Sequence, residues 1–124
     1  MSANAVTRAS TPRYLDVPTT LERLAGDEEL FGEIAQILVQ TAPEQLSTIS
    51  AALAANDLKR TYEEAHSLKG AVAAFEAPEV FTAVAAVERH AKGDDAAAAA
   101  AALVIAHTLV ESLLVELTPY LARR

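Results

Sequence analysis

Three residues close together in the sequence have side chains suited to handling a phosphoryl group: His66, Lys69 and Gly70. Residues three and four positions apart share one side of an α-helix, so all three lie on one helix face. A neutral imidazole can attack phosphorus with its free nitrogen, and a lysine can neutralise the oxygens that carry charge in the loose transition state. A helix-interior glycine costs about 1 kcal/mol relative to alanine. Here it leaves a notch beside the imidazole that a partner's backbone can enter.

The helix expected over about 57–75 must position these side chains. Its apolar and small residues recur at alternating spacings of three and four: Leu58, Thr61, Ala65, Leu68, Val72 and Phe75. This pattern predicts one buried stripe. His66 follows Ala65 of that stripe and so lies about 100° further around the helix. We therefore expect the imidazole to be half exposed, within reach of a partner.

The second ring nitrogen of His66 needs an acceptor that fixes its tautomer. If the chain turns near Ala77 and Pro78 opens the next helix, the two helices are antiparallel. His66 and Glu88 lie equally far before and after that turn and should face each other. Glu88 is therefore a candidate to orient the imidazole, the alternative being an ordinary surface charge.

The remaining pattern indicates an all-α chain. Alanine and leucine dominate, and no segment alternates apolar and polar residues as a half-buried strand does. We expect a flexible N-terminal arm over 1–16 and a bundle domain over 17–124. The expected helices cover 18–25, about 28–55 with a bend or break at Pro43, about 57–75, 78–92 and 95–121. Short connections between them predict an antiparallel four-helix bundle with an additional short N-terminal helix.

Composition and charge exclude several classes of protein. The chain has 124 residues, no cysteine and a net charge of −7, which disfavours nucleic acids and anionic membranes. The longest apolar run, 96–106, is too short to span a bilayer. Without a glycine-rich phosphate loop or a second Glu-x-x-His beside that of His66, no cofactor and no metal are expected. His90 and His107 have no such surroundings, and we expect them to be ordinary surface residues. We expect a cytoplasmic monomer.

The segment Ala65-His66-Ser67-Leu68-Lys69-Gly70-Ala71, followed by Phe75 and Ala77, resembles the signature of histidine-containing phosphotransfer (HPt) domains. The resemblance extends from about Thr19 to Leu121. It implies a phosphorelay intermediate, a phosphocarrier without turnover of its own. His66 would be the phosphoacceptor, Lys69 would support the phosphoryl charge, and Gly70 would give access. Its implied partners are response-regulator receiver domains and a hybrid sensor kinase.

The chain departs from the family pattern at two positions. A glycine is common where Glu76 stands, and a polar residue is frequent where Ala74 stands. Two other functions remain open from the sequence: a bundle that binds receiver domains without carrying phosphate, and the phosphoacceptor module of a larger histidine kinase. For the phosphorelay intermediate, the short N-terminal helix, with Leu21 and Leu24, is expected to help in docking.

Overall fold

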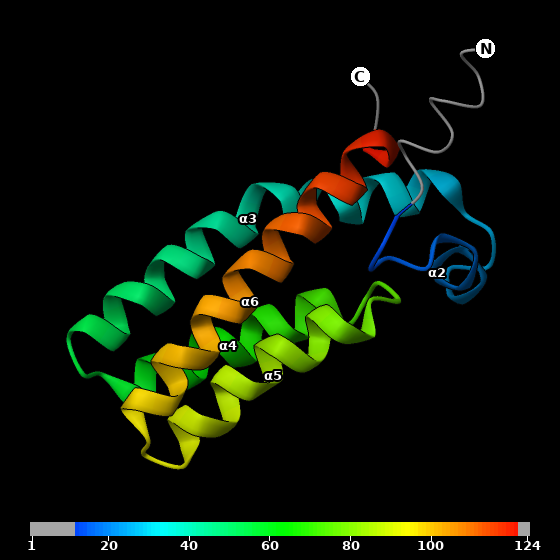
Figure 1. Cartoon of the computed structure of the whole chain (residues 1–124). Helices are drawn as coiled ribbons and strands as arrows, with labels where there is room; N and C mark the ends of the chain where they lie inside the picture. Colours follow the sequence, from blue (N-terminus) through cyan, green and yellow to red (C-terminus); the bar gives the residue numbers. More distant parts are fainter. Residues whose placement is uncertain (1–11, 122–124) are drawn as a thin grey trace.

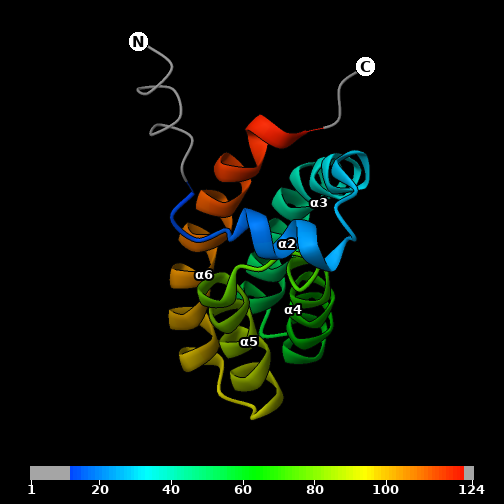
Figure 2. The same cartoon turned by 90° about the vertical axis from the view of Figure 1, so that its right-hand side faces the viewer.

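The computed structural model describes residues 12–121, which form five α-helices and no strand (Figure 1). Helices α3 to α6 form an antiparallel bundle, and α2 lies across the end that carries the α4–α5 turn (Figures 1 and 2). The elements are α2 Val17–Arg23, α3 Glu28–Ala54, α4 Leu58–Val72, α5 Pro78–Lys92 and α6 Ala96–Leu117, followed by the 3₁₀ helix η1 Thr118–Tyr120. The predicted all-α four-helix bundle with a short N-terminal helix is confirmed.

Aspartate caps start three of the long helices. The side chains of Asp27, Asp57 and Asp95 each accept the backbone N–H of the residue three positions later, at 3.0 Å. Such caps satisfy one of the free N–H groups of a helix start. The residues Asn56 and Asp94 precede two of these caps with positive φ angles of 56° and 61°, which turn the chain sharply between antiparallel neighbours.

The predicted buried stripe of α4 is largely confirmed, and α5 and α6 each bury one face as well. Fully buried side chains include Thr61, Ala65, Leu68 and Val72 on α4, Val80, Val84, Val87 and Ala91 on α5, and Ala106, Val110, Leu113 and Leu117 on α6. Leu58 and Leu103 are only partly buried. Helix α4 ends at Val72 rather than at Phe75, but Phe75 still lies in the core at 3% exposure.

Helix α3 continues through Pro43, so the predicted interruption does not occur. Proline removes one backbone hydrogen bond from a helix interior and usually breaks or kinks it. On either side of Pro43, Ala42 and Leu46 are buried in the core. Tertiary packing supplies most helix stability in proteins, and here it keeps the 27-residue helix in one piece.

One helix of residues 12–121, α6 extended through η1 (Ala96–Tyr120), is long and apolar enough to cross a membrane by length and composition. The run 96–106 is too short by itself, but apolar residues continue beyond Ala106 in the same helix, so the length of that run does not exclude a membrane span. The core helix of a soluble bundle passes the same test. In the fold, α6 packs against both α3 and α5, and the absence of a membrane role remains a prediction.

The packed part of the chain begins earlier than the predicted arm boundary at residue 16. Residues 1–11 lie outside the described part of the chain. The backbone N–H groups of Arg13, Tyr14 and Leu15 donate to the Glu116 carboxylate of α6 at 2.9–3.2 Å. Leu15 is 4% exposed. This segment is thus held against the last helix before α2 begins.

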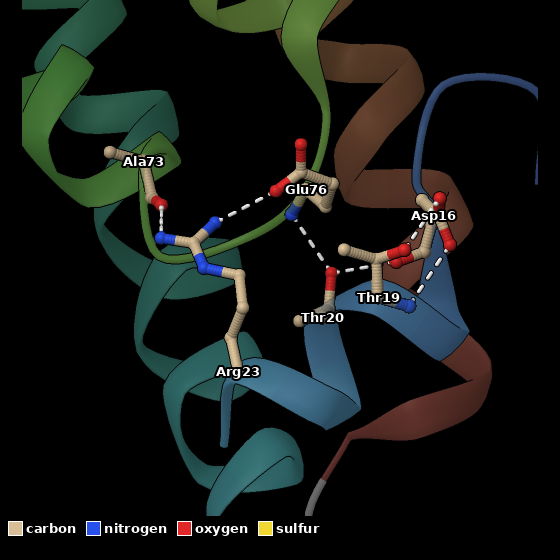
Figure 3. A network of polar contacts seen from close by, with 6 residues as sticks. All are labelled: Asp16, Thr19, Thr20, Arg23, Ala73 and Glu76. Atoms are coloured by element: carbon tan, nitrogen blue, oxygen red, sulfur yellow. Dashed lines mark hydrogen bonds and ion pairs between the residues drawn. The ribbon is translucent and has the colours of Figure 1, made fainter. Parts of the chain in front are cut away.

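Helix α2 is bonded to the α4–α5 turn through Glu76, the residue found where a glycine is common (Figure 3). The buried hydroxyl of Thr20 accepts the Glu76 N–H at 2.8 Å, and the Glu76 carbonyl accepts the Asp16 N–H at 2.7 Å. Arg23 donates to the Glu76 carboxylate at 3.0 Å and to the Ala73 carbonyl at 3.1 Å. These bonds fix the turn that sets α5 beside α4.

Candidate functional site

His66 and Glu88 face each other across α4 and α5, as the sequence predicts. The Nδ1 atom of His66 lies 2.7 Å from Oε2 of Glu88. An ionised carboxylate has no proton to give, so Nδ1 carries the hydrogen and donates it. In the neutral imidazole, Nε2 is then the nitrogen with the free lone pair. The His66 side chain is 61% exposed, whereas that of Glu88 is 12% exposed. The ring is therefore open to solvent, while the glutamate that binds it is mostly buried.

Glu88 also binds Lys69. The Lys69 ammonium lies 2.6 Å from Oε1 of Glu88, and its side chain is 25% exposed. One carboxylate therefore joins the two side chains, with one oxygen for each. Spacing along α4 predicts Lys69 beside His66 but does not reveal this pairing, because it depends on the rotamers of long side chains.

The charge state of Glu88 follows from these contacts. Burial of the carboxylate raises its pKa, but the hydrogen bonds from Lys69 and His66, together with their charges, outweigh burial. The pKa of Glu88 is consequently held below its ordinary value of 4.5. Glu88 is thus an anion at neutral pH, as its role as a double acceptor requires.

Gly70 is exposed on α4, one helical turn after His66. A Cβ atom built at this position would meet no atom within 4 Å. Packing within the protein therefore does not require glycine here, although alanine would favour the helix. The space beside the imidazole is open, as the predicted access notch requires.

Tyr62 was missed by sequence reasoning. Its ring stacks on that of His66, with centroids 5.9 Å apart and an interplanar angle of 19°. The Lys92 ammonium also lies 5.9 Å from the centroid of the Tyr62 ring. The four-residue spacing between Tyr62 and His66 on one helix was the available signal.

Apolar side chains are exposed on α3 and α5, the two helices packed against α4. Phe81 of α5 is 36% exposed and lies 5.9 Å from the Lys69 ammonium, measured from its ring centroid. On α3, Gln45 donates to Ser67 of α4 at 3.1 Å. Ile37 of α3 is also exposed, at 58%. Helices α3 and α5 both pack against α4, so each helix beside the one that carries Gly70 has an exposed apolar side chain.

The other two histidines lie outside this site. His107 is exposed on α6, where its Nδ1 lies 3.6 Å from a Glu111 carboxylate oxygen, and His90 lies in the last turn of α5. Leu21 of α2 and Leu24, the residue that caps its end, are partly buried and pack against the core, and their help in docking stays a prediction. No cluster of three or more His, Asp or Glu residues within 12–121 could hold a metal ion.

Comparison with known proteins places the chain in a family. The Hpt domain family model matches residues 33–118, more than half of the chain. Searches with this chain found no matching curated protein and no matching solved structure. The matched region contains α4, α5 and every residue of the His66 site. The chain therefore belongs to the Hpt domain family, the phosphocarrier modules that interact with receiver domains and kinases in two-component phosphorelays.

Proposed function

We propose that His66 accepts a phosphoryl group from the aspartyl phosphate of one receiver domain and passes it to another. The observation that carries this proposal is the 2.7 Å bond from His66 Nδ1 to Glu88. It leaves Nε2 as the nucleophilic nitrogen on a ring that is 61% exposed. A hybrid sensor kinase is the proposed source of the phosphoryl group, and the proposed setting is a monomer in the cytoplasm.

Each transfer forms one bond to phosphorus and breaks another. The Nε2 lone pair of His66 forms a bond to phosphorus while the bond from phosphorus to the aspartate oxygen of the receiver breaks, and the carboxylate leaves with that electron pair. The ring then carries a positive charge, with its hydrogen still on Nδ1. Glu88 stabilises that charge through the same hydrogen bond, so no proton has to be moved. Transfer to the next receiver reverses these steps.

Lys69 supports the charge of the phosphoryl oxygens. Its ammonium has three hydrogens, and only one is needed for the Oε1 atom of Glu88, 2.6 Å away. The remaining hydrogens are available to a phosphoryl group on the neighbouring Nε2. Positioning and charge neutralisation are the main requirements of phosphoryl transfer, and the pair of Glu88 and Lys69 meets both.

The receiver docks on the surface around Gly70. Gly70 allows close approach, while Phe81 of α5, near Lys69, and Ile37 of α3 are exposed apolar side chains on the helices beside α4. An apolar patch beside a polar reactive group is typical of protein–protein interfaces. This surface is on α3, α4 and α5, and the contribution expected from Leu21 and Leu24 would extend it toward α2.

The test is transfer from a receiver domain carrying labelled aspartyl phosphate. The expected product is acid-labile, base-stable label on the wild-type protein and none on His66→Gln. His107→Gln is the matched control, because that histidine lies outside the site, and it should be labelled like the wild type. Label retained by His66→Gln, or none on the wild type with several receivers, would contradict the proposal.

A bundle that binds receivers without carrying phosphate is the second candidate. It is favoured by the exposed apolar side chains of Ile37 and Phe81, which could bind a partner without a reactive histidine. In that case wild type and His66→Gln would bind a receiver equally and neither would take label. The proposed carrier requires label transfer in addition to binding.

A further inference from the structure

The His66 ring stacks with a side chain that the transfer chemistry itself does not require. Tyr62 lies one helical turn before His66 on α4, and the two rings stack with centroids 5.9 Å apart. The interplanar angle of 19° makes this a near-parallel arrangement. Offset stacking of this kind is a favoured geometry for aromatic pairs.

We infer that Tyr62 is a positioning residue for phosphoryl transfer, which holds the imidazole in one orientation by stacking with it. Glu88 fixes the edge of the ring through Nδ1, but a single hydrogen bond allows the ring plane to tilt about it. The Tyr62 ring restricts that tilt. Together they direct Nε2 along one line of approach. This inference rests on the proposed function of His66.

Lys92 extends the same arrangement. Tyr62 and Lys92 form the next facing pair of α4 and α5, beyond His66 and Glu88, and the Lys92 ammonium lies 5.9 Å from the Tyr62 ring centroid. A cation near an aromatic face is attracted by the ring. Lys92 thus contacts Tyr62 from the opposite helix, so α5 contacts the imidazole directly through Glu88 and its neighbour Tyr62 through Lys92.

A purely structural role for Tyr62 does not account for this placement. Tyr62 is only partly buried and is not one of the side chains that form or pack against the hydrophobic core. Its ring, rather than its hydroxyl, is the part that stacks on His66. Phenylalanine at position 62 should therefore preserve the effect, whereas alanine should remove it.

The experiment uses phosphoramidate, a small phosphoryl donor that needs no receiver docking. We expect Tyr62→Ala to lower the rate of His66 phosphorylation roughly two- to tenfold, the factor that corresponds to a typical aromatic pair. Tyr62→Phe should match the wild type. Glu63→Ala, which changes an exposed neighbour on α4, is the matched control and should also match it. Equal rates for Tyr62→Ala and the wild type would overturn the inference, as would an equal loss in Tyr62→Phe.

A second measurement separates this inference from the proposed function. The His66 Nδ1–H proton can be followed by NMR, and its exchange with water reports how firmly the ring is held against Glu88. Tyr62→Ala should accelerate that exchange and Tyr62→Phe should not. If the wild type takes no phosphate, the proposed function fails and the exchange rates alone decide the role of Tyr62. Unchanged exchange in Tyr62→Ala would overturn that role.

Discussion

Glu88 and Glu116 both accept several hydrogen bonds, but their donors are of different kinds. Glu116 accepts the backbone N–H groups of Arg13, Tyr14 and Leu15. Glu88 accepts from two side chains, those of His66 and Lys69. Backbone donors are fixed by the course of the chain, whereas side chains can share or change partners when a new charge arrives. Glu116 therefore stabilises the fold, and Glu88 organises a site whose contacts can be redistributed.

Loss of the Glu88 carboxylate should have the largest effect on transfer. We expect Glu88→Ala to slow transfer from a phosphorylated receiver by roughly tenfold or more, because the nucleophile loses its orientation. The free energy of unfolding should change by no more than about 1 kcal/mol, since both donors can reach water. The two quantities are measured by a single-turnover transfer assay and by urea unfolding. An unchanged transfer rate would make Glu88 a bystander.

Loss of the Glu116 carboxylate should have the opposite profile. In Glu116→Ala, three backbone N–H groups lose their acceptor, one of them on the buried Leu15. A lost acceptor in a partly buried site costs about 1–3 kcal/mol, so urea unfolding should move to lower concentration. Transfer by the folded protein should stay close to the wild-type rate. Equal damage to transfer in both glutamate variants would remove the contrast between them.

Gly70→Ala should separate stability from transfer within the site itself. An added Cβ meets no atom of the protein within 4 Å, and alanine favours the helix by about 1 kcal/mol. The variant should therefore unfold at higher urea concentration but accept phosphate from a receiver more slowly. Phosphorylation by phosphoramidate should be unaffected, because no receiver has to approach. A wild-type rate with the receiver would show that the notch is not part of the docking surface.

The smallest expected effect is on the pH dependence of stability. The pKa of Glu88 is lower in the folded protein than its ordinary value of 4.5. Its contribution to stability is therefore present above pH 4.5 and is lost as the pH falls through the lower, folded value. Glu88→Gln should remove this part of the acid dependence of unfolding, while Glu63→Gln, at an exposed position, should keep it. An identical pH dependence of the free energy of unfolding in wild type and Glu88→Gln would contradict the lowered pKa of Glu88.

Much of the site follows from sequence because it depends on helix phase. The aspartate caps fix where α4 and α6 begin, and Pro78 fixes the start of α5, so the facing of His66 and Glu88 can be predicted from the turn between them. Helix phase also predicts the exposure of His66. These features need only regular backbone geometry and short connections.

The remaining features depend on side-chain conformation or on contacts distant in sequence. The bond from Lys69 to Glu88 and the stacking of Tyr62 on His66 depend on rotamers, which spacing does not determine. The contact of residues 13–15 with Glu116 joins positions about a hundred residues apart. Such a contact leaves no local pattern, which is why the flexible arm was expected to reach residue 16.

The central claim is that Nε2 of His66 carries the phosphoryl group while Nδ1 keeps its hydrogen bond to Glu88. The most direct measurement is NMR of the protein labelled with ¹⁵N at histidine, before and after phosphorylation by a receiver domain. We predict phosphorus coupling at Nε2 of His66 and a retained proton on Nδ1. Phosphorus on Nδ1, or on another histidine, would contradict the account.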